Sequence, residues 1–182
     1  AREQPFEYSG TASLSDDSLS IFPGQTLPFP CGIWTGTVTI TKAGLTTIKV
    51  ASEGKTGTSN FFVLTPNSFD HFIIGSITEQ TVGAVFTITV TAKDQWENTV
   101  TGFAGTAALT LSPQSTALNP TTTTNFTAGI WQGTVTITEA GTTAIAASCQ
   151  DGAGTSNPFS VTPASLNHFV IGTITEQIAG AV

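Results

Sequence analysis

The chain is poor in charge, and its few charges are mostly of one sign. Only 9% of its 182 residues are charged, with five Lys and Arg against twelve Asp and Glu, for a net charge of −7 at pH 7. An acidic chain without a Lys/Arg cluster lacks the positive surface that binds phosphate backbones, so nucleic acid is excluded as a partner. Anionic lipid headgroups would repel it as well. No apolar run approaches the roughly 18 residues that predict a membrane span, and none is expected in this segment.

Methionine is absent and cysteine occurs only twice, yet 39% of the residues are hydrophobic. Disordered chains combine low hydrophobicity with high charge, so this composition predicts a folded protein. With so few charges, Thr, Ser, Asn and Gln must carry the surface. An uncharged polar surface of this kind suits exposed β-structure and is common in secreted proteins.

What the sequence does have is a long internal repeat. Residues 32–44, Gly-Ile-Trp-Thr-Gly-Thr-Val-Thr-Ile-Thr-Lys-Ala-Gly, return with two changes at residues 129–141, a shift of 97 positions that also relates Trp34 to Trp131. The shift holds without a gap from residues 31–85 to residues 128–182. Solenoid units have periods of about 20 to 50 residues. The repeat therefore predicts duplicated domains, each long enough to bury its own core.

The two cysteines occupy different places in the repeat. Cys31 aligns with Ala128, and Cys149 aligns with Ser52. A disulfide shared by every domain is therefore excluded. Two interpretations stay open: unrelated small buried residues, or a bridge between units that an oxidising exterior would permit.

The repeated sequence alternates between apolar and polar residues, as β-strands do. Phe86, Ile88, Val90 and Ala92 fall on one face of a strand, and the intervening threonines fall on the other. Such alternation predicts antiparallel strands with one buried face. Turn signals recur about every 8–12 residues, and no stretch has a helical period. The fold class is predicted to be all-β.

Seven strands are predicted in the one unit that can be read completely, which favours an immunoglobulin-like sandwich. They are residues 71–77, 85–93, 106–111, 121–128, 130–138, 142–148 and 157–162, of which 121–128 is expected to be an edge or crossing strand.

The repeat also predicts how the chain divides. Residues 67–163 are expected to form a complete immunoglobulin-like domain, and residues 1–66 a partial one that lacks the first strand and most of the second. Residues 164–182 are expected to be a linker and the first strand of a next domain, because 168–182 match 71–85. The two incomplete ends nearly complement each other, short by about six residues. Two accounts follow: a continuous covalent array, which the missing residues favour, or separate chains that exchange strands.

Three segments resemble the tandem immunoglobulin-like repeats of prokaryotic cell-surface proteins, such as those of invasin- and intimin-type adhesins. They are residues 89–105, residues 129–141 and residues 155–163. The resemblance implies an immunoglobulin-like fold and an extracellular or cell-surface location. One departure is Glu97, which precedes Asn98 where such repeats commonly have Gly, so an altered turn is expected there.

No catalytic constellation is predicted. His71 and His168 are equivalent, but Asp70 before the first becomes Asn167 before the second, and a repeated catalytic pair would keep its acid. Both histidines are expected to serve in packing or in linkers. The protein is predicted not to be an enzyme, and no cofactor is expected.

No metal site is predicted either. Asp94, Glu97 and Asn98 could offer oxygen ligands, but Ca²⁺ takes about six to eight, so a solvated turn is the favoured interpretation. Glu79 and Glu176 recur in identical Ile-Thr-Glu-Gln runs and are expected to order a turn or a contact between domains.

Four other residues are candidate sites. Asn125, in Asn-Phe-Thr, is the chain's acceptor triplet for N-glycosylation. Trp96 is a candidate exposed contact for adhesion or packing, whereas Trp34 and Trp131 are expected in cores. Cys31 and Cys149 are the candidates for a disulfide between units.

Taken together, these features predict a structural extracellular repeat protein that forms a stalk, surface layer or filament by end-to-end stacking, with strand complementation between units as one route. The expected partners are copies of itself or adjacent repeats of a longer chain. The alternative is an adhesin module that binds carbohydrate or another cell-surface protein. A third reading is a spacer attached to a secreted hydrolase.

Overall fold

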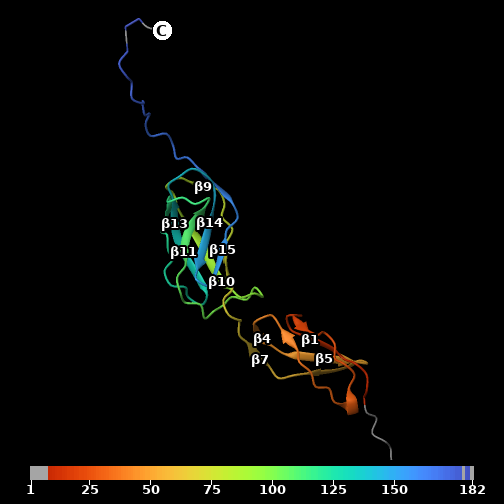
Figure 1. The fold of residues 1–182 in the computed structure, drawn as a ribbon. Coiled ribbons are helices and arrows are strands. Elements are labelled where there is room, and N and C mark those ends of the chain that lie inside the picture. Colours follow the sequence, from red (N-terminus) through yellow and green to blue (C-terminus); the bar gives the residue numbers. More distant parts are fainter. Residues whose placement is uncertain (1–7, 178, 181–182) are drawn as a thin grey trace, which may run out of the picture.

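The computed structural model describes residues 8–177 and 179–180. Its regular elements are strands, apart from one short 3-10 turn, η1 (Pro30–Gly32), so the predicted all-β class is confirmed. The strands fall into two groups, in the first repeat (residues 8–66) and the second repeat (residues 67–163), and no sheet among the described residues joins the groups. Figure 1 shows the groups as two successive bodies, with the tail (residues 164–177) leaving the second one at its far end. Within the described part, no helix is long and apolar enough to cross a membrane.

The second repeat is a sandwich of two sheets. One sheet has the order β12 (Leu118–Asn119), β13 (Ile130–Ile137), β10 (Val85–Lys93) and β8 (His71–Ile74). The other has the order β11 (Ala108–Ser112), β14 (Gly141–Cys149), β16 (Phe159–Thr162) and β9 (Gln80–Thr81), and β15 (Gly152–Thr155) also pairs with β14. All pairs are antiparallel except β16 with β9, which are parallel.

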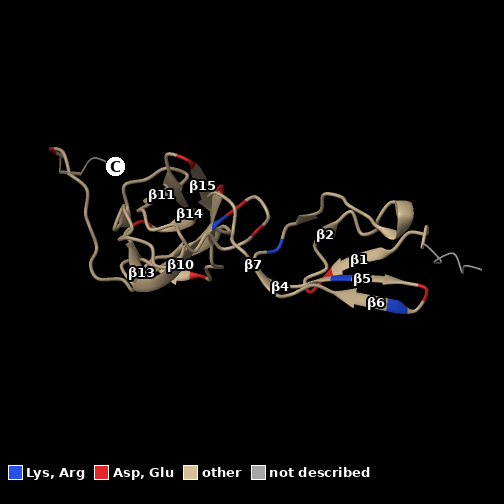
Figure 2. Ribbon diagram, turned by 90° about the horizontal axis from the view of Figure 1, so that it is seen from below, with Lys and Arg blue, Asp and Glu red and all other residues tan. Residues whose placement is uncertain are grey.

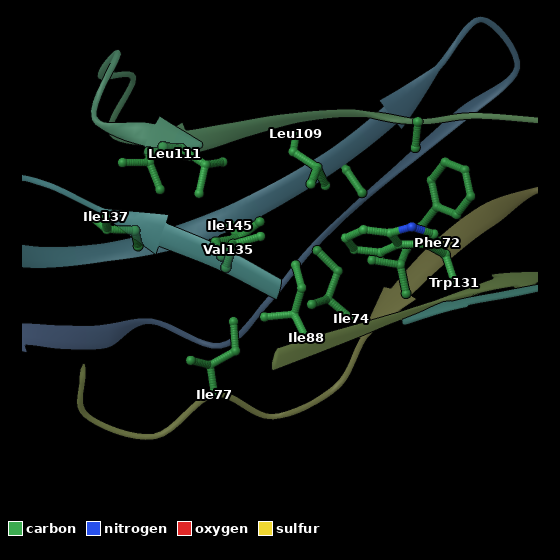
Figure 3. Close-up of a cluster of buried hydrophobic side chains, with 14 of the residues drawn as sticks. Phe72, Ile74, Ile77, Ile88, Leu109, Leu111, Trp131, Val135, Ile137 and Ile145 are labelled. Carbon is green, nitrogen blue, oxygen red and sulfur yellow. The ribbon is translucent and has the colours of Figure 1, made fainter. Parts of the chain in front are cut away.

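The core lies between these sheets and follows the alternation of the sequence. Ile88, Val90 and Ala92 on β10 are buried, and Val90 lies opposite Trp131 on β13. Leu109, Val135 and Ile145 enter the same core from three other strands, as Figure 3 shows. Full burial of each Val, Leu or Ile contributes roughly 1.5–3 kcal/mol, so this cluster is the main source of stability.

Trp131 is buried as predicted, and it needs a glycine two residues later. A Cβ at Gly133 would lie 2.2 Å from the indole ring, so the ring folds over bare backbone. The indole Nε1 donates a hydrogen bond to Thr124 Oγ1 at 3.0 Å. The first repeat keeps the same arrangement at Trp34 and Gly36, where Trp34 is half-buried.

Residues 121–128, predicted to be an edge or crossing strand, do cross between the sheets, but they form no regular strand. This segment makes only isolated bridges, between Thr122 and Ala108 and between Thr127 and Ile130, because it crosses from one sheet to the other. Strands β9, β12 and β15 were not predicted, and each has only two to four residues.

The first repeat is built from shorter strands. They are β1 (Ser13–Asp16), β2 (Ile21–Phe22), β3 (Thr39–Ile40), β4 (Gly44–Thr46), β5 (Ile48–Ser52), β6 (Lys55–Thr58) and β7 (Phe62–Leu64). Within residues 8–66 no strand corresponds to β8 or β10. Residues 33–38, which match most of β13, are irregular there because β13 pairs along its length with β10. The assignment of residues 1–66, 67–163 and 164–182 to domains stays a proposal, and residues 1–7, 178 and 181–182 lie outside the described part.

Candidate functional site: the junction between the repeats

The junction is organised by the loop that follows β10. Asp94 directly follows the strand, and its Oδ1 accepts hydrogen bonds from the backbone N–H groups of Trp96 and Asn98, both at 2.9 Å. The backbone closes the same turn, because Asp94 N donates to Asn98 O at 3.0 Å. A carboxylate that bonds its own loop in this way fixes the turn without help from solvent.

The same carboxylate also holds the connection between the repeats. Asn67 N donates to Asp94 Oδ2 at 2.9 Å, and Asp94 is 0% exposed. Burial alone would raise the pKa of Asp94, but hydrogen bonds from the Asn98 side chain and from the backbone of Asn67, Asn98 and Trp96 outweigh burial and lower it. Asp94 is therefore a buried anion fully bonded by its surroundings, which corrects its interpretation as part of a solvated turn.

Asn98 carries the contact across to the first repeat. Its Nδ2 donates to the backbone oxygen of Thr41 at 2.8 Å, and its Oδ1 accepts from Ala43 N at 2.9 Å. Nδ2 also lies 3.0 Å from Asp94 Oδ2. One amide thus links the turn at residues 41–43 to a carboxylate anchored at the end of a core strand. Figure 2 shows the Lys and Asp/Glu segments that gather where the repeats meet.

Glu97 keeps the turn that glycine would favour. Its φ is 64°, in the left-handed region, so the expected alteration of the backbone does not occur. A side chain in this region costs on the order of 1 kcal/mol. The Glu97 carboxylate lies 3.3 Å from His71 Nε2, and His71 Nδ1 lies 2.9 Å from Asp70 Oδ2. His71 is thus placed among the junction residues, while His168 lies in the exposed tail.

The oxygens of Asp94 are occupied by protein donors, and Glu97 points to His71. Among the described residues, no group of three or more His, Cys, Asp or Glu side chains is arranged to hold a metal ion.

The other candidate residues are scattered. Trp96 is 49% exposed and borders a crevice of about 220 Å³ that is also lined by Thr39 and Thr41 of the first repeat. Asn125 is exposed in an irregular segment. Cys31 is exposed and Cys149 half-buried, both as free thiols. Glu79 and Glu176 are exposed.

The sequence did not reveal that the Thr41 and Ala43 backbones belong to this site. Backbone groups have no residue-type signature, and the separation of 55 to 57 residues hides the contact.

Comparison with known proteins finds only weak structural similarities. No family model matches the chain, and no curated protein matches it. Domains 4 and 5 of the S-layer protein SbsC align with a TM-score of 0.39 and 18% identity, over 83% of this chain and 70% of that one. The D00-D0 domain of intimin aligns with a TM-score of 0.45 and 12% identity, over 85% of this chain and 86% of that one.

A β-glycosidase from Bacteroides vulgatus aligns with a TM-score of 0.47 and 13% identity, over 83% of this chain but only 21% of that one. The chain likewise spans 20% of a longer SbsC fragment with domains 1–6. Since every one of these TM-scores is below 0.5, we draw no argument about function from them.

Proposed function

We propose that the chain is a structural, non-enzymatic repeat protein of the cell exterior, which builds a stalk, surface layer or filament by end-to-end stacking of β-sandwich units. The observation that carries this proposal is the Asp94–Asn98 loop. Its Asn98 side chain bonds backbone groups of the first repeat, and its buried Asp94 carboxylate bonds Asn67 where the second repeat begins. A junction bonded in this way resists bending, as an array of stacked units under tension requires.

The surface composition supports the same role. Exposed Thr, Ser and Asn with few charges suit an extracellular array, as does the resemblance of residues 89–105 to repeats of prokaryotic surface proteins. Copies of the chain, or adjacent repeats of a longer one, are the proposed partners.

The proposal is tested on cells that carry the native protein. Antibody against the chain should label intact cells, and protease added outside should remove the label. High-resolution images of the native assembly should show the sandwiches in single file and reveal whether the backbone is continuous between units. Label found only after cells are opened would contradict the proposal.

An adhesin is the second candidate, and the half-exposed indole of Trp96 is the observation that favours it. Aromatic rings with one exposed face stack well on sugars and on protein partners. Specific binding to glycans or to a cell-surface protein should then fall with Trp96→Ala. Val85→Ala is the control, since Val85 is exposed at the start of β10, and the loop that carries Trp96 follows the other end of that strand. Equal binding by both variants would exclude Trp96 as the contact.

A further inference from the structure

The first repeat has an open apolar groove where the second repeat has a strand. The groove has a volume of about 320 Å³, and Tyr8, Ala12, Phe29, Val50 and Gly57 are among its lining residues. Their counterparts in the second repeat are Phe103, Ala107, Phe126, Ala147 and Gly154. Hydrogen bonds confirm the match: Phe29 N donates to Gly10 O at 3.1 Å, and Phe126 N donates to Gly105 O at 3.0 Å.

In the second repeat this position is filled by Phe72 of β8. Phe103 and Phe126 form an edge-to-face pair with ring centroids 5.0 Å apart, and the Phe72 ring lies 5.4 Å from each of them. In the first repeat Tyr8 and Phe29 form the same edge-to-face pair at 5.3 Å. The third ring is not there within residues 8–66. The aromatic pair is therefore preformed and open on one side.

A glycine marks the path of the absent strand. A Cβ at Gly154 would lie 1.8 Å from the backbone oxygen of Phe72, so only glycine allows β8 to pass. Gly57 is its counterpart on β6, yet a Cβ there would meet only the Val50 side chain, at 3.1 Å. A glycine within a strand commonly marks the close approach of another backbone. At Gly57 no backbone of the described residues lies in that position.

An asparagine provides a third anchor. In the second repeat Asn157 clamps the backbone of Ile77, accepting from its N–H at 2.9 Å and donating to its oxygen at 2.8 Å. Asn60 is the counterpart of Asn157, and its side chain is held in place by a matching hydrogen bond. Its Nδ2 donates to Phe61 O at 2.9 Å, as Asn157 does to Pro158 O. Asn60 is exposed, and among the described residues it holds no strand in this way.

The tail carries the residues that fit these three anchors. His168–Gln177 repeats His71–Gln80 with two substitutions in ten residues. The match aligns Phe169 with Phe72 and Ile174 with Ile77. Phe169 is 84% exposed, whereas Phe72 is 2% exposed. An exposed apolar segment of this kind can add as a strand to the open edge of another chain. Since the tail leaves the second repeat on the side away from the first, it cannot reach the groove of its own chain (Figure 1).

The geometry points to the groove of the first repeat as an acceptor for residues 168–177 of a second copy. The donor places the ring of Phe169 on Tyr8 and Phe29, runs its backbone past Gly57, and is clamped by Asn60 at Ile174. This inference rests on the proposed end-to-end assembly and names its contact. A head-to-tail contact of this type does not close on itself and generates an open filament.

One residue limits how far the docked strand can follow β8. Lys55 stands where the second repeat has Gly152, and a Cβ at Gly152 would lie 2.2 Å from the backbone oxygen of Asp70. The donor therefore diverges before His168 and follows the path of β8 from there onward.

The first test is the mass of the full chain in solution by sedimentation at rising concentration. We expect assemblies that grow with concentration, and Phe169→Ala should weaken the association by roughly a hundredfold, as truncation of a buried aromatic does. Val170→Ala is the matched control, because its counterpart Ile73 faces outward at 41% exposure. Assemblies equally sensitive to both changes, or to neither, overturn the inference.

The second test separates the acceptor from the donor. The Phe169→Ala chain cannot donate but keeps its groove, so a synthetic peptide of residues 166–180 should bind to it. Asn60→Ala in that chain should weaken peptide binding about tenfold or more, with thermal unfolding nearly unchanged because Asn60 is exposed. Gly57→Val should weaken binding as well, and its thermal unfolding is measured alongside because a Cβ there would lie 3.1 Å from the Val50 side chain. No binding at millimolar peptide overturns the inference. Binding by a chain that stays monomeric overturns the second copy as occupant and assigns the groove to a neighbouring repeat. Neither result changes the labelling expected on intact cells, so the proposed function is tested separately.

Discussion

Asn98 accepts a hydrogen bond from the backbone N–H of Ala43 at 2.9 Å, and its amide nitrogen lies 3.0 Å from the buried carboxylate of Asp94. The contact between the repeats is therefore continuous with the interior of the second one. A surface contact between mobile side chains would contribute little, because ordering them costs entropy. Here the loop already holds the Asn98 side chain in place. Two hydrogen bonds from Asn98 to the first repeat are therefore enough to fix the junction.

Replacing Asn98 by alanine should loosen this junction. The change removes both bonds to the first repeat and strips a donor from a buried carboxylate, which costs roughly 1–3 kcal/mol. Small-angle scattering should show a broader distribution of end-to-end distances than in the parent chain. Gln132→Ala is the control, since Gln132 is an exposed amide on β13 whose side chain bonds only Thr89. Equal distributions in the two variants would remove Asn98 as the fixing residue.

Asp16 should make the first repeat sensitive to acid. Burial alone would raise the pKa of Asp16, but hydrogen bonds donated by Ser18, Ser20 and Ile21 outweigh burial and lower it to about 2 from 3.8. A depressed folded-state pKa stabilises the fold above the unfolded value, and that stability is lost as the pH falls toward 2. The contribution is roughly 2 kcal/mol at neutral pH.

The measurement is denaturant unfolding from pH 6 to pH 2, for the parent chain and for Asp16→Asn. The variant should be less stable at pH 6, and the two curves should converge near pH 2. Asp151→Asn is the control, because Asp151 is an exposed turn residue. A variant as stable as the parent at pH 6 would show that the hydrogen bonds around Asp16 contribute nothing.

The sandwich strands were predictable because alternation reports burial directly. β10 and β13 are long, each has one face in the core, and both follow the period of two seen in the sequence. The segment 121–128 contains similar residues and crosses between the sheets as expected, but no local pattern shows that it does so without forming a regular strand. Strands as short as β9 and β12 depend on tertiary contacts alone.

The two candidate sites also differ in how far the sequence could predict them. The proposed acceptor role of the groove could be inferred from the repeat, since the aromatic pair, the glycine and the asparagine each have a counterpart that contacts β8 or the segment after it. The junction could not, because Asp94 bonds mainly to backbone groups, and the residues that supply them have no shared composition. Glu97 shows the limit of pattern matching, since the absence of glycine predicted a change that the surrounding hydrogen bonds prevent.

Asn125 is expected to carry glycan when the chain is made in a host that glycosylates Asn-x-Thr sites. The residue is exposed in an irregular segment, as an acceptor must be, although its neighbour Phe126 is buried. Intact-mass measurement should show a shift that disappears in Asn125→Gln. Thr127→Val is a second control that keeps Asn125 and destroys the acceptor, and it should abolish the shift too. A shift that survives both changes would place the modification elsewhere.

Gly133 tests the packing of the sandwich itself. A Cβ at this position would lie 2.2 Å from the Trp131 ring, which is held by its own hydrogen bond to Thr124. Gly133→Ala must push the indole out of place, and overpacking of this kind costs about 1–3 kcal/mol. Guanidinium unfolding followed by tryptophan fluorescence should show a lower midpoint. Gly102→Ala is the matched control, since a Cβ there would meet nothing within 4 Å. If the two variants unfolded at the same midpoint, the tryptophan could not depend on bare backbone, and the equivalent pair of Trp34 and Gly36 would lose its explanation as well.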